Sequence, residues 1–329
     1  NTPSSIYAEA YARIVQRAAI RRGLLRAASL IAQAAHDETT DIDGVVDASE
    51  EALFEVTAPL ADDDMVALGD LLSADMDRVE AARAAGKPAM GVLTGFTDID
   101  RLLHGFKSTD LVIIAGRPGM GKSALMITAA LHAAHAGQPV AFFTLEMSKE
   151  QVVQRLVSQE SGISLGNILD GNLSDQEWKL YVDTVARINR LPLYIDDNAS
   201  LTPMKLRTKA RRAVRRRGVK MIMVDYLQLM VTAGKSENRA QEVSQITRGL
   251  KQLAKEIGVP VVSAAQLNRD VEKRQDKRPQ LSDLKESGSI EQDSDVVLFL
   301  YREDYYDENS TRANQADVIV AKHRNGATG

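Results

Sequence analysis

Apolar residues recur along the chain with two different periods, and the change between them falls near residue 89. In residues 6–36, 45–56 and 64–84, apolar side chains return every three or four positions, which places them on one face of a helix. Further along, short apolar runs alternate with helical stretches. These runs are residues 111–115, 140–143, 193–195, 221–224, 259–263, 296–300 and 318–321.

The alternating part predicts an α/β fold, in which a parallel-rich sheet is covered by helices on both faces. The earlier part predicts a helical hairpin and then one linker helix. Pro59 and the acidic residues 62–64 break the pattern before that helix, and residues 86–88 end it. We therefore expect three segments: the end of a helical domain in residues 1–60, a linker helix in 61–88 and the α/β domain in 89–329.

Composition narrows the class of protein. Of 329 residues, 44% are apolar and 26% are charged, a balance typical of globular proteins. There is no cysteine, so disulfide frameworks and thiolate metal sites are excluded. The apolar runs fall far short of the ~20 residues that span a bilayer. The first residues also lack the pattern of a secretory leader. We expect a cytoplasmic protein with no membrane partner.

Charge is unevenly distributed. The formal net charge of -4 argues against a uniformly basic nucleic-acid binder. Residues 37–64 hold eleven acidic and no basic side chains, whereas residues 205–220 hold nine basic and no acidic ones. The basic run could contact nucleic acid, but a solvated helix face ahead of the next strand is the favoured interpretation. An acidic chain can still present a local basic surface to phosphates.

One segment matches the phosphate-binding pattern GxxxxGK[ST] in full. It consists of Gly116, Arg117, Pro118, Gly119, Met120, Gly121, Lys122 and Ser123. An apolar strand precedes it and a helical stretch follows, as the motif requires. Its backbone N–H groups can surround phosphates at a helix N-terminus. We expect Lys122 to reach the β- and γ-phosphates of ATP and Ser123 to bind Mg²⁺.

Three polar residues stand at or just beyond the ends of other predicted strands. Asp225 can hold Mg²⁺ through water, or it can be a simple polar cap. Glu146 can polarise a water molecule, or it can be a surface residue ahead of the helix that Ser148 and Gln151 open as a capping box. Gln266 can sense the γ-phosphate, although a loop glutamine bonded to backbone is the simpler interpretation of this residue alone.

Five segments in order resemble the DnaB-type replicative helicases. They read TLEM at 144–147, VDYLQLM at 224–230, QLNR at 266–269, KRP through SDLKESGSIEQD at 277–293, and AKHRNG at 321–326. The resemblance covers residues 91–329 and, more weakly, the helices before them. It implies a RecA-like fold in a ring of six around single-stranded DNA, with ATP between neighbours. It further implies 5′ to 3′ movement and unwinding of duplex DNA at replication forks on the nucleoid, with a primase and a helicase loader as partners.

The resemblance also implies roles for residues that are otherwise ordinary. Within one subunit, Glu146 activates water, Asp225 supports the metal, and Gln266 couples nucleotide state to the DNA loops. Lys322 and Arg324 match a basic pair delivered to the neighbouring subunit, with Arg324 as the arginine finger. Without the resemblance, this pair would be interpreted as solvated charges after an edge strand.

The segment 285–290 matches the loop that follows the DNA backbone in the central channel, and Lys285, Glu286 and Gly288 are its expected DNA-contacting residues. Lys285 can meet a phosphate by charge, and Gly288 lets backbone N–H groups approach closely. Affinity of this kind does not depend on base sequence, which suits a translocating motor.

Two departures from the family pattern occur, Ala265 for a common serine and His323 for a common glutamine, and neither changes a catalytic group. Two other functions stay open. A RecA- or RadA-type recombination ATPase would share the fold and the nucleotide motifs, but the segments 225–229 and 285–289 argue against it. A non-catalytic ring or loader-binding scaffold would bind ATP only for assembly, but Glu146, Asp225 and Arg324 argue against that.

Overall fold

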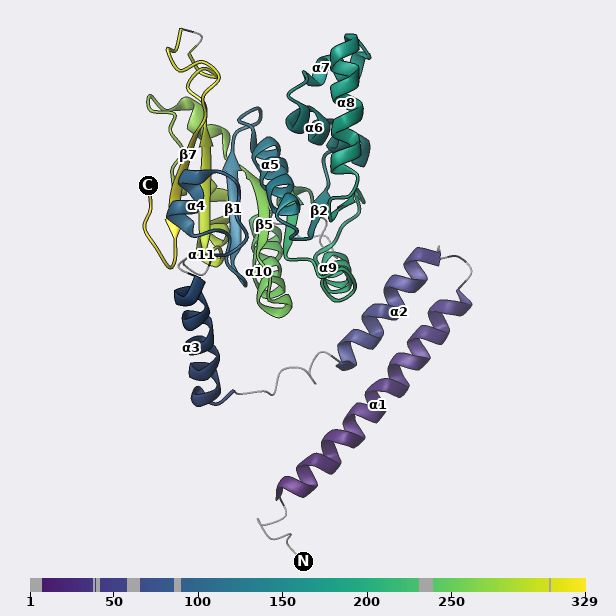
Figure 1. Ribbon diagram of the computed structural model, residues 1–329. Helices are drawn as coiled ribbons and strands as arrows, with labels where there is room; N and C mark the ends of the chain where they lie inside the picture. The colour runs from purple at the N-terminus through teal and green to yellow at the C-terminus, as the bar shows by residue number, and fades with distance from the viewer. Residues whose placement is uncertain are drawn as a thin grey trace, which may run out of the picture. The chain divides into compact units, whose positions relative to one another are not determined.

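The computed structural model describes residues 8–37, 39, 42–57, 66–85, 90–230, 239–307 and 309–329. The chain divides into two compact units, Asn1–Ala85 and Gly86–Gly329 (Figure 1). The expected breaks at Pro59, at residues 62–64 and at residues 86–88 lie outside the described part. The division into three segments therefore stays a prediction.

The first unit is helical. Helices α1 (Ala8–His36) and α2 (Ile42–Thr57) pack against each other as the predicted hairpin. Gly23 allows this approach, since a Cβ atom there would lie 2.9 Å from Cγ1 of Val56. Helix α3 (Leu68–Ala85) corresponds to the predicted linker helix and begins four positions later than expected; residues 64 and 65 of that prediction lie outside the described part.

The second unit is built on a seven-stranded sheet in the order β3-β2-β4-β5-β1-β6-β7. The strands are β1 (Leu111–Gly116), β2 (Val140–Thr144), β3 (Leu193–Asp196), β4 (Met221–Asp225), β5 (Val261–Gln266), β6 (Val296–Tyr301) and β7 (Asp317–His323). Each corresponds to a predicted apolar run. Strands β1 to β6 are parallel, and β7 is antiparallel to β6. Among its described residues the β6–β7 connection contains no helix, and antiparallel neighbours need none.

Helices cover both faces of this sheet, as predicted. The described helices of this unit are α4 (Thr97–Leu103), α5 (Lys122–His135), α6 (Lys149–Ser161), α7 (Leu165–Asp170), α8 (Asp175–Ile188), α9 (Pro203–Arg217), α10 (Arg239–Ile257) and α11 (Gly288–Asp293), with short 3-10 turns η3 (Leu227–Leu229), η4 (Arg269–Lys273) and η5 (Leu281–Ser287); α7 and α8 pack on α6. Successive residues of β1 serve opposite faces. Ile113 packs with Leu206 of α9 and Leu250 of α10, whereas Ile114 packs in the core that includes Met126 of α5.

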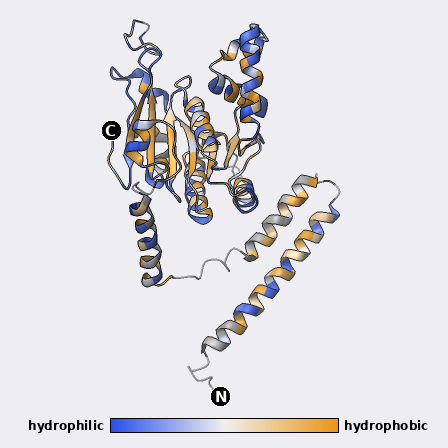
Figure 2. Cartoon of the chain, in the orientation of Figure 1, coloured by the Kyte–Doolittle hydropathy of each residue, from blue (hydrophilic) through white to orange (hydrophobic). Residues whose placement is uncertain are grey.

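The basic run corresponds to α9, which stands out as hydrophilic in Figure 2. Several of its cations are held by acidic groups of the same unit. Arg207 and Arg211 pair with Glu256 at 2.5 and 3.0 Å, and Lys209 pairs with Asp196 at 2.7 Å. These pairs favour a solvated helix face over a nucleic-acid surface. No helix in the described ranges is long and apolar enough to cross a membrane.

Candidate active site

The phosphate-binding motif forms the connection from β1 to α5, at the carboxyl edge of the sheet. Gly119 and Gly121 have φ angles of 79° and 96°, a left-handed conformation that side chains with a Cβ atom rarely adopt. Gly121 is the residue immediately before α5, so the loop turns directly into a helix N-terminus. The local backbone therefore has the geometry of an anion cradle.

Lys122 lies over this loop. Its Nζ donates hydrogen bonds to the carbonyl oxygens of Gly116 and Arg117, each at 3.1 Å. Burial lowers the pKa of the Lys122 ammonium, while the nearby carboxylates of Asp225 and Glu146 act in the opposite direction. The ammonium is thus a partly desolvated cation held against the loop of the cradle.

Asp225 ends β4 with a buried carboxylate, since only 1% of the residue is exposed. Neither of its side-chain oxygens accepts a hydrogen bond from any residue that the structure describes. Burial raises the pKa of this carboxyl group; Ser123 lies close enough to lower it, although no bond between the two meets ordinary geometric limits. An orphaned carboxylate beside a hydroxyl fits a divalent cation.

Glu146 follows β2 at the same edge. Thr144 is in register with Asp225, and the Leu145 N–H donates to the Asp225 carbonyl at 2.7 Å, so the chain after β2 stays beside β4. The Thr144 hydroxyl accepts from the Met147 N–H at 3.1 Å and donates to its carbonyl at 2.9 Å. The exposed Glu146 carboxylate is near enough to raise the pKa of Asp225. The predicted capping box of Ser148 and Gln151 is confirmed.

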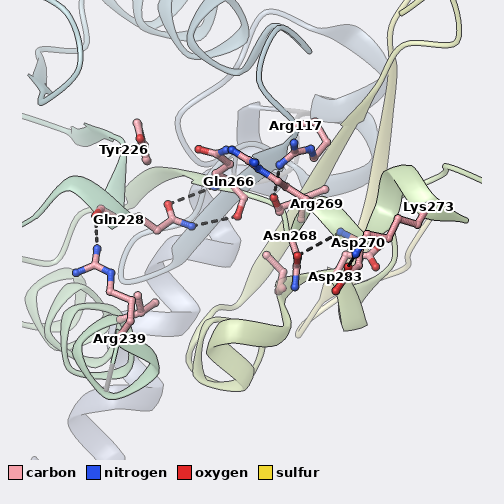
Figure 3. A pocket seen from close by; sticks show the side chains of 13 residues that line it. Arg117, Tyr226, Gln228, Arg239, Gln266, Asn268, Arg269, Asp270, Lys273 and Asp283 are labelled. Atoms are coloured by element: carbon pink, nitrogen blue, oxygen red, sulfur yellow. Dashed lines mark hydrogen bonds and ion pairs between the residues drawn. The ribbon is translucent and has the colours of Figure 1, made fainter. Parts of the chain in front are cut away.

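Gln266 is the last residue of β5, level with Gly116 of β1. Its main chain is bonded on both sides by the side chain of Gln228: the Gln266 N–H donates to Oε1 at 3.2 Å, and its carbonyl accepts from Nε2 at 3.1 Å (Figure 3). Gln228 was not among the candidate residues. The sequence feature that could have indicated a role for Gln228 is its position three residues after Asp225.

The side chain of Arg117 is directed away from the cradle. It is buried, with 7% of the residue exposed, and it donates from Nη1 to the Leu267 carbonyl at 2.9 Å and from Nε to Glu272 at 2.8 Å. With Gln228, Arg239, Gln266 and nine other residues it lines a cavity of about 570 Å³ (Figure 3). Any contact of Arg117 with a nucleotide therefore comes from its main chain.

Lys322 and Arg324 lie at the opposite edge of the sheet. The Lys322 Nζ donates to the Ser294 carbonyl at 2.7 Å, and Arg324 forms an ion pair with Asp295 at 3.0 Å. Asp295 precedes β6 and pairs with Leu111, the first residue of β1. Since β1 has six residues, the pair is separated from its own phosphate loop by about 20 Å, at about 3.3 Å per residue.

The segment expected to meet DNA spans η5 and α11. Leu284 and Ile290 anchor it in the hydrophobic core, and both η5 and α11 contact α10. The side chains of Lys285 and Glu286 lie outside the described part. Gly288 has φ −50°, an ordinary helical value, and a Cβ atom there would meet nothing within 4 Å. The fold itself does not require glycine at this position.

Comparison with known proteins decides the family. Residues 91–329 match the family described as DnaB-like helicase C terminal domain. The chain belongs to the DnaB family of replicative DNA helicases. It is 41% identical to the replicative DNA helicase DnaB of Geobacillus stearothermophilus over 99% of this chain and 72% of that protein. It is 42% identical to the DnaB protein of Leifsonia xyli subsp. xyli over 99% and 72%.

Solved structures of related proteins share the fold. One of them, described as an ATPase domain, superposes with a TM-score of 0.76 at 36% identity, over 81% of this chain and 94% of that one. A DnaB-like replicative helicase, whose structure is described together with its interactions with primase, gives a TM-score of 0.73 at 33% identity, over 99% and 77%. The fold is therefore RecA-like, and the protein is an ATP-hydrolysing replicative DNA helicase. The two alternative functions, a recombination ATPase and a non-catalytic scaffold, are therefore set aside in favour of a helicase.

Proposed function

We propose that this DnaB-family chain acts as one subunit of a hexameric ring that moves along single-stranded DNA, with ATP and Mg²⁺ bound at each subunit interface. The observation that carries this proposal is the separation of the two halves of the site. The cradle, Lys122 and Asp225 lie at the carboxyl edge of the sheet, whereas Arg324 lies at the amino edge. One copy cannot bring them together, so a second copy must supply Arg324.

The residues of the cradle bind the triphosphate and the metal. The main chain of residues 116–123 surrounds the phosphates, and Lys122 exchanges its two carbonyl partners for phosphate oxygens. Ser123 and Asp225 hold Mg²⁺, which neutralises charge on the β- and γ-phosphates. The unbonded oxygens of Asp225 support this assignment. The described ranges hold no group of three or more His, Cys, Asp or Glu that could hold a metal, so Ser123 and Asp225 would hold Mg²⁺ together with the bound nucleotide.

Hydrolysis then requires an attacking water molecule and a cation supplied by the neighbouring copy. Glu146 is exposed beside Asp225 and accepts a proton from the attacking water. Arg324 of the neighbouring copy leaves Asp295 and stabilises charge that develops on the γ-phosphate. Lys322 accompanies it. Because the finger arrives only with the neighbour, hydrolysis depends on assembly.

Helix α3 serves as the linker that holds neighbouring copies together. Several of its large apolar side chains are exposed within the first unit: Leu68, Leu71, Leu72, Met76 and Val79 are each more than half exposed. Five such side chains on one helix leave a sizeable apolar surface without cover, which is typical of an interaction surface. We propose that it packs on the α/β domain of a neighbouring copy.

Single-stranded DNA passes through the ring and meets the segment 285–290. Lys285, Glu286 and Gly288 contact its sugar–phosphate backbone, and the absence of a structural need for glycine at Gly288 supports this role. Movement is 5′ to 3′, and a primase and a helicase loader bind the ring, as the family resemblance implies.

The test is DNA-stimulated ATPase activity with unwinding of a forked duplex, measured with ATP and magnesium. In Glu146→Gln the rate should fall by about 10² to 10⁴ while nucleotide binding is retained, because only the proton acceptor is lost. Glu150→Gln, an exposed position on α6, is the matched control. Equal rates in wild type and Glu146→Gln would remove Glu146 from the mechanism.

A further inference from the structure

The side chain of Gln228 takes the place of a neighbouring strand beside Gln266. Strand β4 pairs with β5 only from Ile222 to Val224, opposite residues 261–263. Beyond that point β4 gives way to the 3-10 turn η3, which carries Gln228. The amide of Gln228 offers one acceptor and one donor, and both are used on the Gln266 main chain, at 3.2 and 3.1 Å. The Gln228 side chain therefore bonds the backbone of β5 at Gln266, beyond the part that is paired with β4.

A second contact holds the next peptide from the opposite direction. Arg117 of the phosphate loop donates to the Leu267 carbonyl at 2.9 Å, and the Leu267 N–H reaches the Gly116 carbonyl at 3.4 Å. The peptide joining Gln266 and Leu267 is therefore fixed between the end of β4 and the phosphate loop. A shift of either element moves this peptide.

The same backbone leads to the proposed DNA loop. The Asn268 N–H donates to the Asp283 carbonyl at 3.2 Å, and Asp283 lies in η5, which continues to Lys285. Gln228 is also tied to α10, because Arg239 donates to its main-chain carbonyl. Hydrogen bonds join Gln228 to Gln266 (Figure 3), and two residues further along the backbone the Asn268 N–H is bonded to η5.

We propose that Gln228 is a positioning residue that links the nucleotide site to the DNA loop by fixing the backbone of Gln266. This inference rests on the proposed function, since it assumes that ATP binds the cradle and DNA binds residues 285–290. We assign Gln228 no direct contact with either ligand. It sets the position from which the Gln266 side chain faces the γ-phosphate and from which η5 receives the resulting movement.

The experiment measures ATPase activity of the full chain with and without single-stranded oligonucleotide. Gln228→Met keeps the length of the side chain and removes both hydrogen bonds. The DNA-stimulated kcat should fall by about tenfold, the effect of losing two neutral hydrogen bonds. The basal rate should fall less than the DNA-stimulated rate, and the KM for ATP should stay within about twofold, because the cradle is intact. Gln252→Met, at an exposed position on α10, should behave as wild type.

Two further variants separate positioning from mere support of the fold. Gln228→Glu keeps the acceptor for the Gln266 N–H but loses the donor, so it should give an intermediate loss of stimulation. In a double-mutant cycle, Gln228→Met and Gln266→Ala should be strongly non-additive, since both act through one residue. A merely structural role would instead lower the basal and stimulated rates equally, together with Tm.

The outcomes distinguish the two proposals. Wild-type DNA stimulation that persists unchanged in Gln228→Met, or an equal fall of both rates, overturns the role of Gln228 alone. Absence of DNA-stimulated ATPase activity in the wild type itself would overturn the proposed function as well.

Discussion

Arg324 forms an ion pair with Asp295 of its own chain, with Nη1 3.0 Å from Oδ1. Asp295 has two other partners, since the Lys251 Nζ lies 2.5 Å from Oδ2 and the Leu111 N–H donates to the same oxygen at 2.8 Å. Arg324 is about half exposed, whereas Asp295 is buried. Arg324 can therefore move away from Asp295 while Lys251 still compensates the charge of that carboxylate.

This relationship predicts the behaviour of Arg324→Ala. Hydrolysis should fall by ~10³ or more, because the finger is lost. The free energy of unfolding should change by less than about 1 kcal/mol, since Arg324 is half exposed and Lys251 still compensates the charge of Asp295. Nucleotide binding, measured by titration with a fluorescent ATP analogue, should stay near wild type. Full hydrolytic activity in this variant would sink the finger assignment.

Asp225→Asn should raise the stability of the metal-free protein and abolish most of its ATPase activity. Burial raises the pKa of Asp225, so its charged form is disfavoured in the fold unless a cation is bound. Without magnesium, the variant should be more stable than wild type by about 1 to 3 kcal/mol, because an unbonded buried carboxylate is removed. With magnesium and ATP, hydrolysis should be largely lost. Urea unfolding with and without Mg²⁺ checks this, and a less stable metal-free variant would contradict it.

Asp110 predicts a pH dependence of stability. Burial, and then the charge of Asp295, raise the pKa of Asp110 from 3.8 to about 6. The folded state therefore binds a proton that the unfolded state has released, and this contribution is complete below pH 3.8 and lost as pH rises through about 6. Asp110→Asn should flatten the stability profile between these values and stabilise the protein at pH 7.5 by about 1 to 3 kcal/mol. An unchanged profile would show that Asp110 titrates normally.

The apolar surface of α3 predicts an effect on assembly alone. Leu71 and Met76 are 54% and 71% exposed, so Leu71→Asp and Met76→Asp together should leave the fold of a single copy intact. The hexamer should be weaker and dissociate already at a higher protein concentration than the wild type, because a charged group cannot be buried at the interface without cost. Sedimentation velocity measures this, with the exposed Asp77→Ala as control. Stable hexamers in the double variant would refute the linker role.

Local patterns in the sequence predicted much of this structure. The seven apolar runs became the seven strands, because a buried parallel sheet needs near-continuous apolar residues. The phosphate loop was visible because its glycines and its lysine are required by the backbone and by charge within eight consecutive positions. The capping box at Ser148 was equally local.

Contacts between distant residues could not be predicted in this way. The Arg117 side chain meets Leu267, 150 positions away, and nothing around Arg117 reveals that partner. Gln228 looks like any polar residue in a 3-10 turn until β5 lies beside it. Strand β7 is antiparallel to β6, and the described residues between the two strands form no helix. The alternation of apolar runs and helical stretches in the sequence did not predict this direction.

The central claim is that each ATP site is shared between two copies, and mixing two inactive variants tests it most directly. Lys122→Ala lacks a working cradle and keeps Arg324, while Arg324→Ala lacks the finger and keeps the cradle. When the two are dissociated and reassembled together, some interfaces join an intact cradle to an intact finger. We predict that the mixture regains basal ATPase activity that neither variant has alone. A mixed assembly without such activity, or hydrolysis by Arg324→Ala alone, would contradict the account.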